Sequence, residues 1–295
     1  MDIATIAAAE FTSSPFYYPF SSLKALSQTR LSDKLRPAGG QKISLYKGYS
    51  AYLVGMGIYP ISLYREIKLS DKYPGLKNGY IETLMNSANL SVILTPFDRV
   101  QIMSQTSNVS TTQIFKNLMM QQNRISSFYR GFNISFVNNV MFMGICKSMH
   151  SYMEKKSDKS DNLIKVTITK KKQTEFACYS ESDQKVEQSE ELVEEDISKE
   201  ANKVIRSFGN FILSGILSTA IVHPIDTIRT CVMSDVVQIN GKPGSSIEVA
   251  KSIYNSYGPK GFYRGLTPSL VSTGVGSTLI ITVGVFYTSV ILARG

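Results

Sequence analysis

The chain has 295 residues, a formal net charge of +9 and a mean hydropathy of −0.04. Its two histidines and three cysteines show neither metal-ligand nor disulfide spacing. No constellation of side chains suits nucleophilic or acid–base catalysis. Composition therefore excludes a disulfide framework, and we expect no enzyme activity, no catalytic residue and no metal site.

A mean hydropathy near zero is usual for soluble proteins, but here the charges are segregated. In chain order, the uncharged runs are 11–23, 48–64, 83–97, 131–146, 207–225 and 265–293. The last run can span a bilayer unaided, because a spanning helix needs about 20 residues. Buried helices of a soluble protein would explain one short run but not all six. The pattern predicts an all-α membrane protein with six transmembrane helices.

A repeated motif organises these runs. An aromatic residue, a basic residue and a glycine recur as Tyr46-Lys47-Gly48, Tyr129-Arg130-Gly131 and Tyr263-Arg264-Gly265. Upstream of each motif, an apolar stretch ends at a proline: Pro19, Pro96 and Pro224. Three motifs in register with three prolines indicate tandem repeats. We predict one domain over 1–295, with repeats near 1–70, 78–153 and 203–295 and a charged insertion at 154–202.

These motifs resemble those of the mitochondrial carrier family over nearly the whole chain. That family carries Pro-x-acidic-x-x-basic at the end of each odd helix and aromatic-basic-Gly before each even one. The third repeat matches fully, whereas Gln101 replaces the basic residue of the second repeat and Ser21 replaces the acid of the first. The resemblance implies a degenerate member with three tandem helix pairs and pseudo-threefold symmetry in the mitochondrial inner membrane.

The resemblance also implies a matrix-side gate where the three proline-containing helices meet. The expected pairs are Asp98 with Arg229, Asp226 with Lys24, and Ser21 with Gln101. Glutamine braces are matched by Gln28 and Gln105. Both departures from the family fall in one pair, and replacing both halves of a buried ion pair can be neutral, whereas breaking one half costs roughly 3–5 kcal/mol.

The opposite gate and the central cavity differ from the family pattern. No acid follows the aromatic residue at 64–68, 146–150 or 286–290. The even-helix positions that contact substrate in the family are occupied here by Gly55, Asn138, Asn139 and Ser272. Without a cation at this depth, an anionic substrate is not expected. The asparagines could bind a small polar solute, but we favour helix–helix hydrogen bonding.

The basic residues predict the orientation. Segments 24–47, 99–130 and 227–264 together carry 15 basic and 3 acidic residues, a net charge of +12. The positive-inside rule places these segments in the matrix and both termini toward the intermembrane space. Anionic lipid is a better partner for them than nucleic acid. By resemblance, Gly48, Gly131 and Gly265 mark three cardiolipin sites, and we expect no other cofactor.

The insertion separates two kinds of charge. Residues 155–172 hold seven lysines and two aspartates, and residues 175–200 hold ten acids and two lysines. Such polar sequence is normally disordered, and its bipolar charge suits docking on other subunits. The leading hypothesis is a transport-impaired accessory subunit of a respiratory-chain or ATP-synthase complex. The alternative is an active carrier of a small neutral or cationic metabolite.

Overall fold

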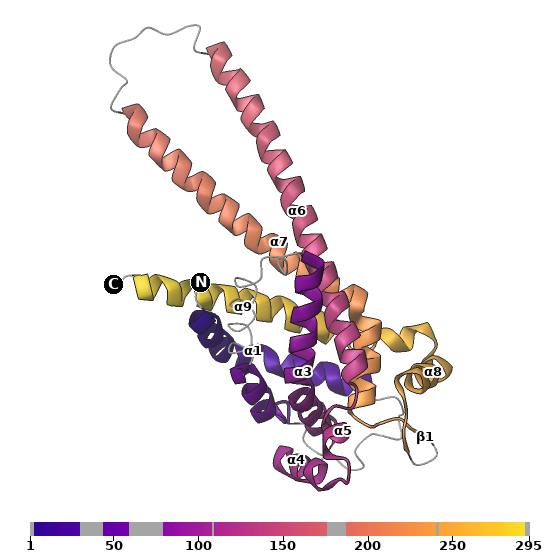
Figure 1. Cartoon of the computed structure of the whole chain (residues 1–295). Coiled ribbons are helices and arrows are strands. Elements are labelled where there is room, and N and C mark those ends of the chain that lie inside the picture. The colour runs from indigo at the N-terminus through magenta and orange to yellow at the C-terminus, as the bar shows by residue number, and fades with distance from the viewer. Residues whose placement is uncertain are drawn as a thin grey trace. The chain divides into compact units, whose positions relative to one another are not determined.

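The computed structural model describes residues 3–29, 44–58, 79–107, 109–175, 187–239 and 242–292, and these are mostly helical (Figure 1). The elements are α1 (Ile3–Thr29), a helix at Tyr49–Ile58, α3 (Gly79–Thr106), α4 (Thr111–Met120), α5 (Arg124–Phe128), α6 (Phe132–Glu175), α7 (Glu187–Met233), β1 (Gln238–Ile239), β2 (Lys242–Pro243), α8 (Ser246–Tyr257), η4 (Pro259–Tyr263) and α9 (Leu266–Leu292).

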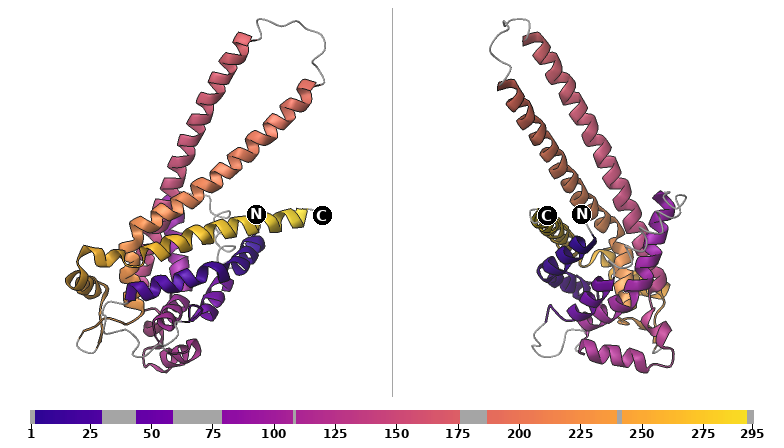
Figure 2. Two further views of the ribbon diagram at one scale, coloured as in Figure 1. Left: turned by 180° about the vertical axis from the view of Figure 1, so that it is seen from behind. Right: turned by 60° about the vertical axis from the view of Figure 1, so that its left-hand side comes forward.

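The chain divides into two compact units. The first contains residues 1–145 and 215–295, and the second contains residues 146–214. Helices α6 and α7 each contribute to both units. In the first unit, α1 packs along α9 and also contacts α3 (Figure 1, Figure 2). The first and last described helices of the chain are therefore neighbours.

The short helices α4 and α8 dock in the same way. Each begins after a serine N-cap, Ser110 or Ser245, whose hydroxyl accepts the backbone N–H three residues later. Four and eight residues after that serine lie the buried side chains, Ile114 and Leu118 in α4, Val249 and Ile253 in α8. This i, i+4 spacing places both apolar residues on one helix face.

Each buried pair belongs to a small core that fixes the short helix to the end of a proline-containing helix. The α4 core adds Val100 of α3 and Ala51 of the Tyr49–Ile58 helix, and the α8 core adds Cys231 and Val232 of α7. The second and third repeats thus share one order: a long helix with an internal proline, a short docked helix, a glycine turn and another long helix.

The all-α prediction holds for most of the described residues, with one small exception. Strands β1 and β2 form an antiparallel pair in which Gln238 lies opposite Pro243. The chain enters this hairpin after Asp235, which has a φ of 53° in the left-handed region. Aspartate tolerates this conformation better than most residues, so a turn replaces further helix here.

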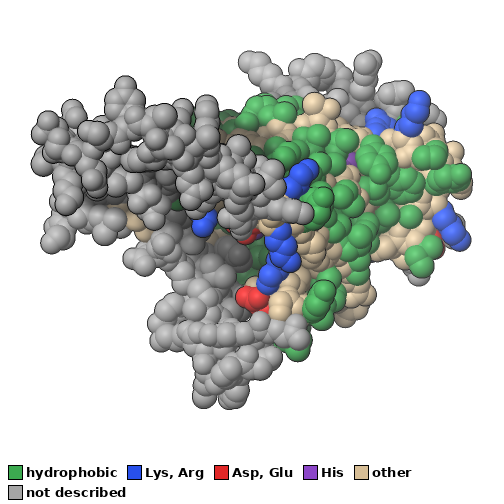
Figure 3. All heavy atoms as spheres, turned by 90° about the horizontal axis from the view of Figure 1, so that it is seen from above, with side chains coloured by type: hydrophobic (Ala, Val, Ile, Leu, Met, Phe, Trp, Pro, Cys, Tyr) green, Lys and Arg blue, Asp and Glu red, His purple; other side chains and the backbone are tan. Residues whose placement is uncertain are grey.

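Within the described residues, two helices are long and apolar enough to cross a membrane, at Asn202–Met233 and Pro259–Thr288. Large apolar side chains are also exposed on several helices, for example Val92 in α3, Val137 in α6 and Phe286 in α9. Figure 3 shows hydrophobic side chains spread widely over the described part of one face. Extensive exposed apolar surface suits contact with lipid.

The described parts of the insertion are helical, although their composition is typical of disordered segments. Helix α6 continues to Glu175, and α7 already begins at Glu187. Neither 147–175 nor 187–208 contains a glycine or a proline, so nothing in these segments breaks a helix. Near the base of the second unit, the Ser207 hydroxyl donates to Glu154 at 3.1 Å, and the ring of His150 packs edge-on against Phe211.

Candidate functional site

Charged side chains meet just after the internal prolines of α1, α3 and α7. Lys24 Nζ lies 2.7 Å from Asp226 Oδ2. Arg229 forms an ion pair with Asp98, and its other terminal nitrogen lies 3.9 Å from Asp226 Oδ1. We call Lys24, Asp98, Asp226 and Arg229 the ion-pair ring. The structure brings together both charged pairs that the motif register predicts.

Polar neighbours hold this ring in place. Gln28 donates to Asp226 Oδ2 at 2.9 Å and to Thr227 Oγ1 at 3.3 Å, so the predicted brace lies against the ring. Arg229 Nε donates to the hydroxyl of Ser135, which is buried, at 2.9 Å. Sequence reasoning missed Ser135, although it lies four residues after Gly131 and so faces the same side of α6 as the turn.

The third junction, between α1 and α3, is neutral but differs in detail from the prediction. Gln105 donates to the Tyr18 hydroxyl at 3.0 Å and to the Ser22 hydroxyl at 3.1 Å. Between the predicted partners Ser21 and Gln101, both of which are described, the structure gives no hydrogen bond. The brace position thus makes the α1–α3 link, and the serine one residue further along receives it.

We predict that Arg229→Ala destabilises the protein by up to about 3–5 kcal/mol, the cost of stranding one charge of a buried pair. The pair is partly exposed, with side-chain exposures of 15% for Arg229 and 26% for Asp98, so the lower end is expected. Thermal unfolding in mild detergent measures the change. The Ser21→Ala/Gln101→Ala double variant is the control and should lose much less. Equal losses in both variants would contradict the importance of the ion pair.

The three motif glycines adopt one conformation. Gly48, Gly131 and Gly265 have φ values of 80°, 85° and 78°, and a helix begins directly after each. Each glycine carbonyl accepts the N–H four residues later, which starts the helix. A left-handed φ is costly for residues with a Cβ, so the motif requires glycine.

Each glycine turn also packs against the end of a proline-containing helix from another repeat. A Cβ on Gly48 would lie 2.8 Å from the carbonyl oxygen of Gln101, and one on Gly265 would lie 3.0 Å from that of Lys24. A Cβ on Gly131 would lie 3.1 Å from the Met233 side chain. The contacts therefore run from the first repeat to the second, from the second to the third, and from the third back to the first.

The aromatic residue of the motif has its own hydrogen-bond partner. The Tyr46 hydroxyl donates to the Pro15 carbonyl at 3.1 Å, and the Tyr129 hydroxyl donates to the Val92 carbonyl at 3.0 Å. These carbonyls lie four residues before Pro19 and Pro96. Proline has no N–H, so each carbonyl lacks its usual helical donor. The tyrosine hydroxyl replaces that donor.

In the third repeat, the aromatic residue of the motif makes a different contact. Tyr263 stacks on the ring of His223, with centroids 6.3 Å apart, and His223 Nε2 lies 3.0 Å from the Arg264 carbonyl oxygen. In the described part of the chain, no hydrogen bond from the Tyr263 hydroxyl is present. The motif aromatic is therefore a hydrogen-bond donor in two repeats and a packing residue in the third.

We predict that Tyr129→Phe destabilises the protein by about 0.5–1.5 kcal/mol, because the Val92 carbonyl loses its donor. Tyr263→Phe is the matched control, since its hydroxyl donates to no described partner, and it should change stability little. Thermal unfolding of both variants in one detergent measures the difference. A larger loss in Tyr263→Phe than in Tyr129→Phe would refute the role of the hydroxyl.

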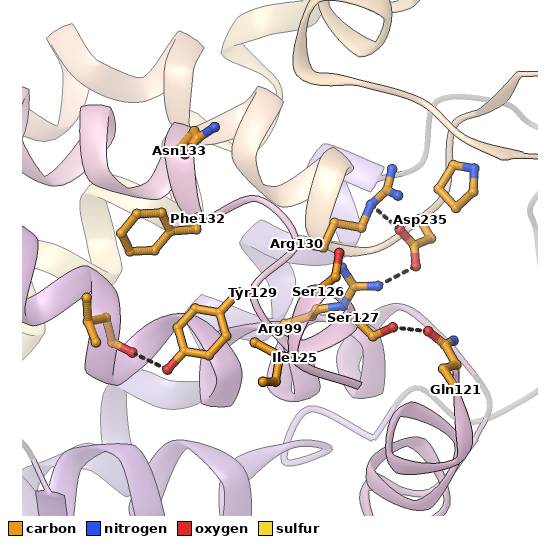
Figure 4. Close-up of a pocket in the computed structure, with 12 residues that line it drawn as sticks. Arg99, Gln121, Ile125, Ser126, Ser127, Tyr129, Arg130, Phe132, Asn133 and Asp235 are labelled. Carbon is orange, nitrogen blue, oxygen red and sulfur yellow. Dashed lines mark hydrogen bonds and ion pairs between the residues drawn. The ribbon is translucent and has the colours of Figure 1, made fainter. Parts of the chain in front are cut away.

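A cavity of about 640 Å³ opens beside the second glycine turn (Figure 4). Asp235 pairs at 2.8 Å with both Arg99 and Arg130, two cations around one carboxylate. Arg99 is 2% exposed, and its Nε and Nη1 atoms have no described hydrogen-bond partner. Burial raises the pKa of Asp235, and the two arginines oppose that rise. The cavity wall thus carries excess positive charge, which suits an anion.

The predicted cavity residues contact neighbouring helices. Asn139 Nδ2 donates to the Ser91 hydroxyl at 2.9 Å, and Gly55 approaches Phe97, so that a Cβ there would lie 3.2 Å from it. Asn138 is buried, and its side-chain oxygen has no described partner. Ser272 is partly buried. The Asn139 bond is the helix–helix interaction that we favoured.

Two features at the far end of α1 were not predicted. The Thr12 hydroxyl lies 3.2 Å from that of Tyr287 in α9, which gives this end of the bundle a neutral link. Glu10 accepts hydrogen bonds from the hydroxyls of Tyr17 and Tyr52. The signal for Glu10 was its spacing of 4, 7 and 11 residues from Ser14, Tyr17 and Ser21, which is one helix face. Of the other outer-gate candidates, residues 64–68 lie outside the described part.

Comparison with known proteins gives a family that part of the chain resembles. Residues 201–291 match the family described as mitochondrial carrier protein. The mitochondrial substrate carrier family protein H of Dictyostelium discoideum is 36% identical over 75 residues, which cover 24% of this chain and 20% of that protein. The mitochondrial glycine transporter of Emericella nidulans is 34% identical over 83 residues, which cover 28% and 24%.

These alignments span about a fifth to a quarter of the relatives' own lengths. The family match lies on the third repeat, where the sequence motif is complete. This part of the chain is therefore similar to the mitochondrial carriers, the family that its motifs resemble.

Proposed function

We propose that this chain is a carrier that moves a small neutral or cationic solute across the mitochondrial inner membrane by alternating access. The observation that carries the proposal is the closed order of contacts among the three repeats. Each glycine turn packs on the proline-containing helix of another repeat, from first to second to third and back to first. This order supports a bundle of six transmembrane helices with pseudo-threefold symmetry.

The two ends of the bundle supply the two gates of this proposal. The ion-pair ring closes the matrix side and is braced by Gln28, while Gln105 links α1 to α3 beside it. On the other side of the ring, further toward the start of α1, the Thr12–Tyr287 contact is a neutral link between α1 and α9. A carrier needs two states within a few kcal/mol of one another. The termini would face the intermembrane space, opposite the basic loops.

The accessory-subunit hypothesis is the weaker of the two. It depended on the absence of charged pairs from the outer gate, on an uncharged cavity and on an insertion suited to docking on other subunits. Thr12 and Tyr287 provide a neutral link where no ion pair was predicted, and Glu10 places a charge within α1. One relative is named a substrate carrier and the other a transporter. These points favour transport.

Uptake by the reconstituted protein tests the proposal. Liposomes containing the purified full chain should show saturable uptake of at least one solute from a panel of neutral, cationic and anionic metabolites. A variant lacking 158–200 should retain that uptake, because the insertion contributes nothing to the ion-pair ring. Absence of uptake across the panel, together with co-migration in a large complex on native isolation, would instead support an accessory subunit.

We also propose that cardiolipin binds at the glycine turns near Gly48, Gly131 and Gly265. The cavity beside Gly131 supports this site, because Arg99 and Arg130 exceed the charge of Asp235 and the N-terminus of α6 lies alongside. Phosphate binds readily at helix N-termini, where backbone N–H groups and the helix dipole favour an anion.

Added cardiolipin should raise the melting temperature of the wild-type protein in detergent. Arg99→Gln should reduce that rise, because Asp235 keeps Arg130 while the cavity loses its surplus charge. Lys251→Gln, on the exposed face of α8, is the matched charge control and should respond like wild type. Equal responses of all three proteins to cardiolipin, relative to a neutral phospholipid, would contradict the assignment of this cavity.

A further inference from the structure

A carboxylate lies within α1, enclosed by tyrosines from two helices. The Tyr52 hydroxyl donates to Glu10 Oε1 at 2.5 Å, and the Tyr17 hydroxyl donates to the same oxygen. The Ser14 hydroxyl lies 2.8 Å from that of Tyr49. We call Glu10, Tyr17, Tyr49 and Tyr52 the tyrosine site. Neither hydroxyl bond engages Oε2 of Glu10, which keeps its acceptor capacity.

The rings of this site form one aromatic wall. Tyr17 meets Tyr52 edge-on at a centroid distance of 6.5 Å, and Tyr49 stacks on Tyr52 at 6.1 Å. Tyr18 lies behind them, 4.9 Å from Tyr49, and is fully buried. Gly276 of α9 allows the Tyr17 ring to approach the backbone, since a Cβ there would lie 3.4 Å from that ring. The wall is therefore fixed by contacts on three helices.

The face of α1 that carries Glu10 leads to the ion-pair ring. Glu10, Ser14, Tyr17, Ser21 and Lys24 recur at intervals of three or four residues, which places them on one side of a helix. Lys24 binds Asp226 of α7, so this side faces the other helices. Glu10 precedes Ser21 by 11 residues, or about 16 Å of helix, which is about half the thickness of a bilayer core.

Glu10 differs from the other two carboxylates that face this interior. Asp98 and Asp226 each pair with a cation, whereas no lysine or arginine of the described residues lies within ion-pair distance of Glu10. A carboxylate at membrane depth is costly and is retained where it has a function. Tyrosine hydroxyls reduce this cost, but they do not neutralise the charge.

A cation would balance the charge of Glu10, and the side chains around Glu10 determine which kind of cation fits. Tyrosine rings attract organic cations through their faces at distances up to about 6 Å, whereas a hydrated metal ion needs several oxygen ligands. An ammonium group combines the two requirements, because its charge pairs with a carboxylate and its substituents pack on aromatic rings. Backbone and side-chain contacts on α1, α9 and the Tyr49–Ile58 helix already hold the rings in place.

We propose that the tyrosine site binds the ammonium group of the transported solute, with Glu10 as its counter-ion and Tyr17, Tyr49 and Tyr52 as its aromatic wall. This inference rests on the proposed transport function and narrows its substrate class to ammonium compounds. The solute is then recognised by α1 and the Tyr49–Ile58 helix, with Glu10 as the charged residue. The even-helix positions Gly55, Asn138 and Ser272 do not take this role.

Binding and uptake are measured separately. Full-length protein in detergent is titrated with ethanolamine, with choline and with 3,3-dimethylbutan-1-ol, an uncharged compound of the same shape as choline. At least one ammonium compound should raise the melting temperature, and the alcohol should not. Glu10→Gln keeps an oxygen that accepts from the tyrosines but lacks the charge, so affinity should fall roughly 30-fold or more. Glu10→Asp keeps the charge and should recover part of the affinity.

The controls separate the two proposals. Asn139→Ala, which breaks a helix–helix bond away from the tyrosine site, should leave ammonium binding unchanged. If ammonium binding depends on Glu10 but the liposomes show no uptake, the tyrosine site is supported and transport is refuted. Uptake of an uncharged solute that Glu10→Gln leaves intact would retain transport and refute this site. If Glu10→Gln fails to fold, Glu10→Asp and Tyr49→Phe are measured instead. The proposal is overturned if the ammonium compounds raise the melting temperature of neither variant and the alcohol raises that of the wild-type protein as much as they do.

Discussion

A proline inside a membrane helix leaves one backbone carbonyl without a donor, and no water is available in the bilayer core to replace it. This chain places such a proline in each repeat and supplies substitutes for the missing donor in two of them. Tyr46 and Tyr129 reach back from the aromatic-basic-Gly motif to the free carbonyls of Pro15 and Val92. The motif that starts one helix thus completes the hydrogen bonding of the helix before it.

The same motif also fixes how the repeats meet. Its glycine adopts a left-handed turn close to the backbone of another repeat, and its basic residue can bind carbonyls across the junction, as Arg130 does with Gly244 at 2.7 Å. The three residues of the motif therefore supply a hydrogen-bond donor to one helix, begin the next helix and contact a neighbouring repeat. The ion-pair ring lies at these junctions, so its register is set by backbone geometry as well as by charge.

The pairs of the ring could be predicted because the resemblance of the motifs to a known family implied them. The glycine turns could be predicted because a helix-start glycine depends on a local rule. The α1–α3 junction could not be predicted in detail, because Ser21 and Gln101 lack the charges that would select one pairing. The structure instead links Gln105 to Ser22 and Tyr18.

Other features escaped prediction for different reasons. Glu10 lies just before the first uncharged run and shares a helix face with Tyr17, but Tyr52 comes from another helix, so only the folded chain reveals that all three meet. The charged insertion has the composition of a disordered segment, yet it has no glycine or proline to end the helices on either side. Helix propensity decided the backbone there, where composition had indicated disorder.

The packing of α1 along α9 has a consequence for the order of folding. The contact of Gly265 with Lys24 and the bond of Tyr287 with Thr12 join positions separated by more than 240 residues. Contacts between residues so far apart in sequence form late, because closing the long loop between them costs chain entropy that is offset only after the contacts have formed. Helix α1 precedes α9 in the chain, so the side of α1 that α9 covers stays uncovered until the third repeat is made. The bundle is thus completed in one step, when α9 packs along α1, and not by the addition of one finished repeat after another.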